Sequence, residues 1–277
     1  MKDTDFLPEQ ESKPGPALGY AFFLCVLYLV VSVLAQILLG FSGLSINRYL
    51  IILISMLVAW PTTLLTGILW KKVPARAAFP LTSVKIPILP SVVLISSGAA
   101  VLLTNIALHI PVPDSLAKIM IDLWSNANKD TISFLYFLTF AVIAGPIFEE
   151  LFFRGLLLRT FLKRYSITKA IWLSAAFFAL FHLNPWQAFL ALPAGLFFAW
   201  LTWWTESLIP AIVGHVAMNL ACSFLFRGAA LFEYGAETLI KGDFPPALLA
   251  AAIMIFGTGS LVLWWQFRRY CSDLRRL

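Results

Sequence analysis

Charged residues are scarce in this sequence of 277 amino acids. Only 12% of the residues are Asp, Glu, Lys or Arg, whereas soluble chains carry about a quarter. Hydrophobic residues make up 60% and the mean hydropathy is +0.86. The apolar residues come in long uninterrupted blocks and not in the short bursts of a soluble core. This composition excludes a soluble globular domain and indicates a polytopic membrane protein.

Cysteine is nearly absent. The three cysteines, Cys25, Cys222 and Cys271, show neither a disulfide framework nor metal-ligand spacing. A basic n-region is also missing from the first 16 residues, so they are not typical of a cleavable signal peptide. We expect residues 1–16 to form a short disordered cytoplasmic tail, and the first hydrophobic block to stay in the mature protein as a signal anchor.

Eight apolar blocks are long enough to cross a bilayer, which requires roughly 20 residues per helix. The sequence therefore predicts an all-α transmembrane bundle of about eight spans, with the fourth able to kink at Gly145-Pro146. The expected spans are 17–41, 49–70, 90–110, 131–163, 168–185, 187–205, 208–226 and 246–267.

Basic residues set the expected orientation. With a cytoplasmic N-terminus, 14 basic residues fall on the inside and 5 on the outside, so both termini are predicted to be cytoplasmic. The same bias explains the net charge of +6, which is therefore no sign of nucleic-acid binding. The inside set is Lys2, Lys13, Lys71, Lys72, Arg76, Lys85, Arg159, Lys163, Arg164, Lys169, Arg268, Arg269, Arg275 and Arg276; the outside set is Arg48, Lys118, Lys129, Arg227 and Lys241.

We divide the chain into four parts. Residues 1–16 are the tail, and 17–130 hold the N-terminal membrane helices with a short amphipathic surface helix predicted within 111–130. Residues 131–226 hold nearly all the intramembrane polar groups. Residues 227–277 comprise an outer loop, the last span and a basic C-terminal tail.

Ionisable side chains inside a membrane span are costly, and each one is a candidate functional residue. Here they gather in three short segments: Glu149, Glu150 and Arg154 in the first, His182 in the second, and His215 with Asn219 in the third. Glu150 and Arg154 are four residues apart and are expected to pair on one helix face. Glu149 lies about 100° around the helix and points elsewhere.

The depth of these segments suggests that they meet. Glu149 precedes Lys163 by fourteen residues and His182 follows Lys169 by thirteen, which places both on the order of 20 Å from the inner surface. The third segment lies roughly 14–20 Å beyond Glu206 by the same rise. We therefore expect one constellation near the middle of the membrane.

Three chemistries fit these residues. In the first, Glu149 with His182 holds a water and acts as general base for peptide hydrolysis. His215 and Asn219 donate hydrogen bonds to the oxyanion, while Glu150 and Arg154 support the site. In the second, Glu149, His182 and His215 bind a catalytic zinc, although no His-Glu-x-x-His motif is present. In the third, the cluster carries protons or ions in a transporter, or only ties helices together.

Three motifs resemble the CPBP family of CAAX prenyl endopeptidases and bacteriocin-processing (Abi) proteins. They are Glu149-Glu150-x-x-x-Arg154 followed by Gly155, Phe178-x-x-x-His182, and His215-x-x-x-Asn219. The resemblance covers about residues 131–226 and shows no departure at these positions. Each motif is weak by itself, but the three in order are specific.

The resemblance implies an all-helical intramembrane endopeptidase that is glutamate-dependent and needs no cofactor. Glu149 and His182 would activate the water, and His215 with Asn219 would form the oxyanion hole; zinc and a non-catalytic immunity-type protein stay open as alternatives. The implied partner is a membrane-associated or lipidated protein or peptide, and the expected location is a prokaryotic plasma membrane. Nothing in the sequence shows prenyl specificity, since Trp186, Trp200, Trp203 and Trp204 are typical of interfacial belts and helix packing.

Overall fold

The computed structural model describes residues 17–72, 74–84, 88–111, 113, 115, 118, 122, 125–231 and 244–274. Within these residues every regular element is a helix, as the hydropathy blocks predict. The helices are α1 (Ala17–Gly40), α2 (Arg48–Lys71), α3 (Ala75–Ala78), α4 (Leu89–Leu108), α6 (Thr131–Leu138), η1 (Thr139–Ala144), α7 (Gly145–Glu150), η2 (Leu151–Leu158), α8 (Arg159–Leu162), α9 (Ile167–Phe181), α10 (Pro185–Thr205), α11 (Ile209–Leu231) and α13 (Pro246–Leu274).

Six helical stretches are long and apolar enough to cross a membrane: 17–40, 48–71, 89–108, 131–162, 185–205 and 246–270. Two further apolar helices coincide with expected spans but are shorter, Ile167–Phe181 and Ile209–Leu225. The integral-membrane, all-helical prediction is therefore confirmed, whereas a count of eight full spans and the cytoplasmic orientation stay predictions. The predicted tail 1–16 lies outside the described residues, as do most of the loop 227–245 and much of the surface helix 111–130.

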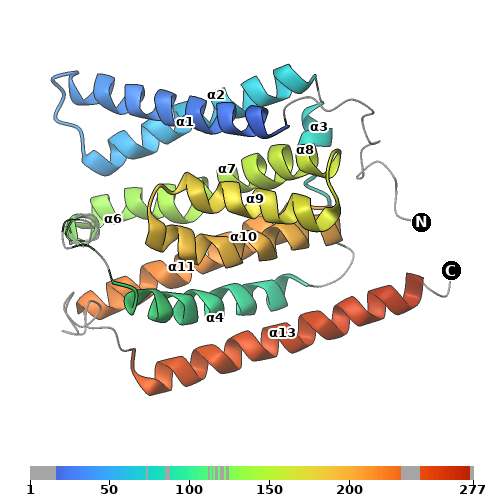
Figure 1. Ribbon diagram of the computed structural model, residues 1–277. Helices are drawn as coiled ribbons and strands as arrows, with labels where there is room; N and C mark the ends of the chain where they lie inside the picture. The colour runs from blue at the N-terminus through green and yellow to red at the C-terminus, as the bar shows by residue number, and fades with distance from the viewer. Residues whose placement is uncertain are drawn as a thin grey trace.

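The long helices run side by side as one bundle (Figure 1). α1 pairs with α2, α9 with α10, and α4 packs against both α11 and α13. α1 begins and α13 ends toward the same end of the bundle (Figure 1). This arrangement places the stretch 131–162 between the α1–α2 pair and the remaining helices.

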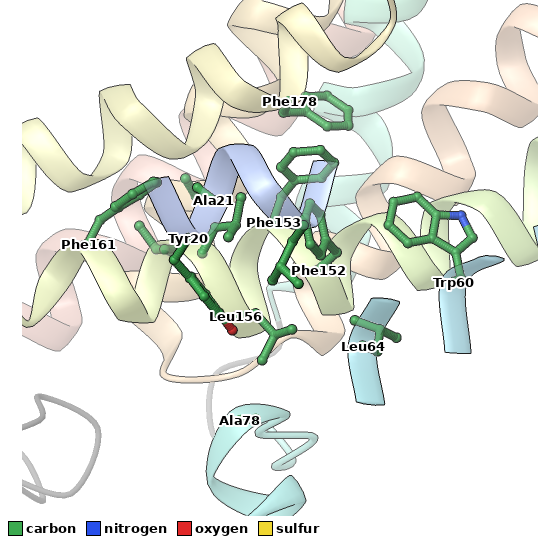
Figure 2. Close-up of a cluster of buried hydrophobic side chains, with 14 of the residues drawn as sticks. Tyr20, Ala21, Trp60, Leu64, Ala78, Phe152, Phe153, Leu156, Phe161 and Phe178 are labelled. Atoms are coloured by element: carbon green, nitrogen blue, oxygen red, sulfur yellow. The ribbon is translucent and has the colours of Figure 1, made fainter. Parts of the chain in front are cut away.

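The main apolar core lies where α1 and α2 meet η2 and α9 (Figure 2). Trp60 and Leu64 of α2 face Phe152 and Leu156 of η2 in this cluster. A second cluster joins α4, α10, α11 and α13 around Phe198 and Val92. The two clusters enclose the helix segments that carry the polar motifs.

Side-chain caps fix several helix starts. The Asn47 side chain accepts from the N–H of Tyr49 at the start of α2 and donates to Ser133 Oγ of α6 at 2.8 Å. Asp130 accepts from the N–H of Ser133 and so caps α6. Such caps satisfy backbone donors that a helix leaves free at its N-terminus. The Asn47–Ser133 bond also ties the beginning of α2 to the beginning of the stretch that carries both glutamates.

Candidate active site

The stretch 131–162 is one continuous helix with two π-helical segments, η1 and η2, on either side of the short α7. The sequence suggested a kink at Gly145-Pro146, and the structure shows a change of hydrogen-bond register at that point instead. In η1 the N–H of Gly145 donates to the carbonyl of Phe140, five residues back. π-helical turns occur frequently at functional sites, and α7 between these two carries Glu149 and Glu150.

Asn219 completes the hydrogen bonding of η1. In the five-residue register the carbonyl of Ala141 would accept from residue 146, but that residue is proline and has no N–H. The Asn219 amide of α11 donates to this carbonyl at 2.9 Å. A carbonyl without a hydrogen bond in the bilayer core would be costly. Asn219 therefore has a structural role, the bond to Ala141, that its motif did not predict.

The second π segment receives a similar bond. Ser174 Oγ of α9 donates to the carbonyl of Phe153 in η2 at 2.9 Å. Both residues are fully buried, so no solvent competes for the bond. A side chain from a neighbouring helix therefore supports each irregular segment of the long helix.

Glu150 is the centre of the polar network. Its Oε1 accepts from Arg154 Nη1 at 2.7 Å, which confirms the predicted i, i+4 ion pair. The same oxygen lies 2.8 Å from Nδ1 of His215. The side chains of Glu150 and Arg154 are fully buried, and Arg154 also donates to the carbonyl of Gly195 in α10 at 3.2 Å. Three separate parts of the chain are thereby held at one point.

Glu149 faces the same histidine from the other side of the ring. Its Oε2 lies 3.7 Å from Nε2 of His215, and its side chain is 20% exposed, unlike that of Glu150. As the helix geometry predicted, Glu149 makes no ion pair with Arg154 among the described residues. Of the two adjacent carboxylates, only Glu149 is accessible to a reactant.

Phe178 lies between the two histidines. Its ring makes edge-to-face contacts with His182, at 5.1 Å between centroids, and with His215, at 5.5 Å. The Arg154 guanidinium lies 4.5 Å from the same ring, and Phe198 stacks on His215 at 5.4 Å. These rings surround the ion pair with apolar surface, which gives Phe178 in the second motif a physical role.

His182 is the C-cap residue of α9, one position after the last helical residue Phe181. Its Nδ1 lies 2.9 Å from the carbonyl of Phe178. Leu183 follows with a left-handed φ of 52°, and Asn184 then caps α10. Among the described residues no hydrogen bond or ion pair joins His182 to Glu149. His182 is therefore linked to the cluster by its contact with the Phe178 ring, which also contacts His215. Glu149 lies beside His215 itself.

The predicted zinc alternative requires Glu149, His182 and His215 to converge on one ion. Within the described part of the chain, no three His, Cys, Asp or Glu side chains gather closely enough to hold a metal. Nδ1 of His215 lies beside Glu150 and Nδ1 of His182 faces its own helix, so Nε2 is the nitrogen that each ring has left for another ligand. The zinc alternative stays a prediction.

Tyr28 of α1 is a site residue that sequence reasoning missed. Its ring contacts Trp60 at 4.1 Å and Phe181 at 5.0 Å between centroids. It is close enough to Glu149 for an electrostatic interaction. The polarity of one tyrosine in a first span was too weak a signal, because tyrosine is common in membrane helices.

Together, fold and site define an integral membrane protein with a buried carboxylate–histidine cluster. Residues 131–221, about a third of the chain, match a family described as "Rce1-like: Type II CAAX prenyl endopeptidase Rce1-like". This match confirms the resemblance to the CPBP family and shows that the segment is similar to CAAX prenyl endopeptidases. Comparisons with curated proteins and with solved structures found no match.

Proposed function

We propose that this protein is an endopeptidase that hydrolyses a peptide bond of a membrane-associated or lipidated protein, using a water activated by glutamate and histidine. The supporting observation is the contrast between the two adjacent carboxylates. Glu150 is fully buried and neutralised by Arg154, whereas Glu149 is partly exposed beside His215. One glutamate is therefore structural, and the other is placed for chemistry.

In the proposed reaction Glu149 takes a proton from a water whose oxygen attacks the scissile carbonyl carbon. The protonated carboxyl then returns that proton to the leaving amine as the C–N bond breaks. His182, whose Nδ1 is occupied by the Phe178 carbonyl, would bind the same water through Nε2. No metal and no cofactor take part in this scheme.

The oxyanion of the tetrahedral intermediate would be stabilised by His215 and Asn219. Because a carboxylate only accepts, the Nδ1 of His215 facing Glu150 must carry a proton. His215 can then donate to an oxyanion only through a protonated Nε2. In that state two carboxylates balance Arg154 and His215. The Asn219 amide has two N–H groups, and the Ala141 carbonyl uses one of them.

The substrate class follows from where the site lies. Glu149 is in a helix long and apolar enough to cross a membrane, and in that placement a substrate must bring its peptide bond into the bilayer. A protein or peptide anchored in the bilayer, by a lipid or a hydrophobic segment, meets this requirement. The proposed location is the plasma membrane of a prokaryote.

The test compares the termini of membrane proteins from cells that express the wild-type protein or Glu149→Gln. New termini that the wild-type protein produces about 10²–10⁴-fold faster than Glu149→Gln support Glu149 as the general base. Asp122→Asn, which changes an exposed carboxylate away from the cluster, is the matched control and should cleave normally. If folded wild type and Glu149→Gln give identical termini, the proposal is wrong and a transport or binding role takes its place.

A further inference from the structure

A groove unrelated to the glutamate cluster lies between α4, α10, α11 and α13, the lower helices of Figure 1. Its volume is about 590 Å³, within the ~300–1,000 Å³ typical of small-molecule sites. Apart from the hydroxyls of Ser96 and Ser260, aliphatic and aromatic side chains line it. Its ligand must therefore be almost entirely apolar along its length.

The groove has fixed walls. A Cβ on Gly98 would lie 2.8 Å from Phe256, and one on Gly259 would lie 2.9 Å from Leu94. These glycines allow α4 and α13 to approach closely, as small residues do between membrane helices. Because the two helices are in direct contact there, the groove beside them exists before any ligand enters.

The length of the groove fits one leaflet of a bilayer. Along α13 it extends from Phe256 to Phe267, which is roughly 16 Å at the rise of an α-helix. Half of a hydrocarbon core of about 30 Å is ~15 Å. One acyl chain, extended from the interface toward the midplane, would fill this length.

Aromatic and basic residues mark one end of the groove as the interfacial end. Phe267 contacts Trp200 and Trp204, and Trp204 contacts Tyr270, as expected for an aromatic belt. Arg268 is exposed and stacks at 4.7 Å on Trp264, which lines the groove. A cation therefore stands where the headgroup of a lipid in the groove would lie.

We propose that this groove binds an anionic phospholipid of the bilayer, with one acyl chain between α4, α10 and α13 and the phosphate beside Arg268. Met218 of α11 lines the groove one residue before Asn219. The bound chain thus packs on the helix that carries His215 and Asn219. Lipid occupancy supports the position of α11, and it does not depend on the proposed proteolysis.

The test uses the purified full chain in phosphatidylcholine vesicles with a phosphatidylglycerol whose acyl chain carries a photoreactive diazirine. Mass spectrometry should find cross-links concentrated on groove residues such as Met218 and Leu263. Unlabelled phosphatidylglycerol should displace the probe, and phosphatidylcholine should not. Labelling spread evenly over the outward faces of α1 and α13, or equal competition by both lipids, would show annular lipid only and overturn the proposal.

Two matched pairs of variants locate the site. Arg268→Gln should weaken displacement by phosphatidylglycerol about fivefold, while Arg269→Gln, whose side chain stacks on Trp265 outside the groove, should leave it unchanged. Ala99→Trp should fill the groove and suppress cross-linking there, unlike Val93→Trp on the exposed face of α4. If Ala99→Trp does not fold, the comparison of Arg268→Gln with Arg269→Gln still tests the proposal.

Two further results separate this proposal from the enzymatic one. The Glu149→Gln protein should bind the probe as wild type does, because its substitution lies outside the groove. A lipidated peptide that displaces the probe where phosphatidylglycerol fails would make the groove a substrate-chain site, and the phospholipid proposal would be wrong.

Discussion

The two longest helical stretches among the described residues, 131–162 and α13, differ in regularity. The stretch 131–162 contains two π-helical segments, an internal proline and four charged residues, Glu149, Glu150, Arg154 and Arg159. α13 has 29 residues in an unbroken α-helix, and no charged residue occurs in it before Arg268. Of these two helices, only the irregular one carries residues of the candidate active site.

The difference shows what irregular backbone requires in a membrane. The carbonyls of Ala141 and Phe153 accept bonds from Asn219 and Ser174 of neighbouring helices, as unsatisfied groups in hydrocarbon are costly. Such partners exist only inside the bundle. α13 packs mainly on α4 and exposes Met254, Leu261 and Trp265, so the described part of the bundle offers it fewer side-chain donors than the stretch 131–162 receives.

The largest effect is expected from breaking the buried ion pair of the irregular helix. Arg154→Met leaves Glu150 buried with only His215 to balance it, which should lower the free energy of unfolding by about 3–5 kcal/mol. Glu150→Gln/Arg154→Met should lose less than the single change, since no unpaired charge remains. Unfolding in mixed detergent micelles with rising SDS measures both. Equal stability of Arg154→Met and wild type would mean that the pair is solvated.

The second prediction concerns the register of η1. A Cβ at Gly145 would lie 2.7 Å from the carbonyl of Phe140, and this backbone atom cannot move without disturbing the π turn. Gly145→Ala should therefore destabilise by about 3 kcal/mol, as overpacking does, and should reduce proteolysis because Glu149 is displaced. The same SDS titration and the terminus assay measure the two effects. Unchanged stability with full activity would show that the site tolerates an ordinary α-helical register.

The third prediction isolates the bond from Asn219. Asn219→Ala leaves the Ala141 carbonyl without its side-chain donor and should cost about 1.5 kcal/mol. Pro146→Ala supplies an N–H that can reach this carbonyl in the π register. In a double-mutant cycle the stability cost of Asn219→Ala should then shrink, although activity should not return if Asn219 also binds the oxyanion. A cost that is the same in both backgrounds would contradict this account of η1.

The sequence predicted the parts of the fold that depend on hydropathy. The blocks 17–41, 49–70 and 131–163 match the helices 17–40, 48–71 and 131–162 within one residue at each end. Equal depth also predicted that Glu150 and His215 belong to one cluster, and helix spacing predicted the pair of Glu150 with Arg154.

Other features depend on contacts between helices that no local pattern records. η1 precedes Pro146, and the two π segments receive side-chain donors from residues 78 and 21 positions away in the chain. The bond from Glu150 to His215 requires knowing which ring nitrogen faces the carboxylate. The sequence predicted that the fifth span continues to residue 185, whereas α9 ends at Phe181 and Leu183 is left-handed. No glycine at this position signals the end of the helix.

The smallest expected effect completes the comparison of the two long helices. An added Cβ at Gly257 of α13 meets no atom within 4 Å. Gly257→Ala should therefore stabilise by about 0.5–1 kcal/mol through helix propensity, opposite in sign to Gly145→Ala, and should leave proteolysis unchanged. The two changes are chemically identical, so a difference in sign in the same SDS titration can come only from the backbone around each glycine. If Gly145→Ala and Gly257→Ala lose stability equally, the irregular backbone around Gly145 does not set the stretch 131–162 apart from α13.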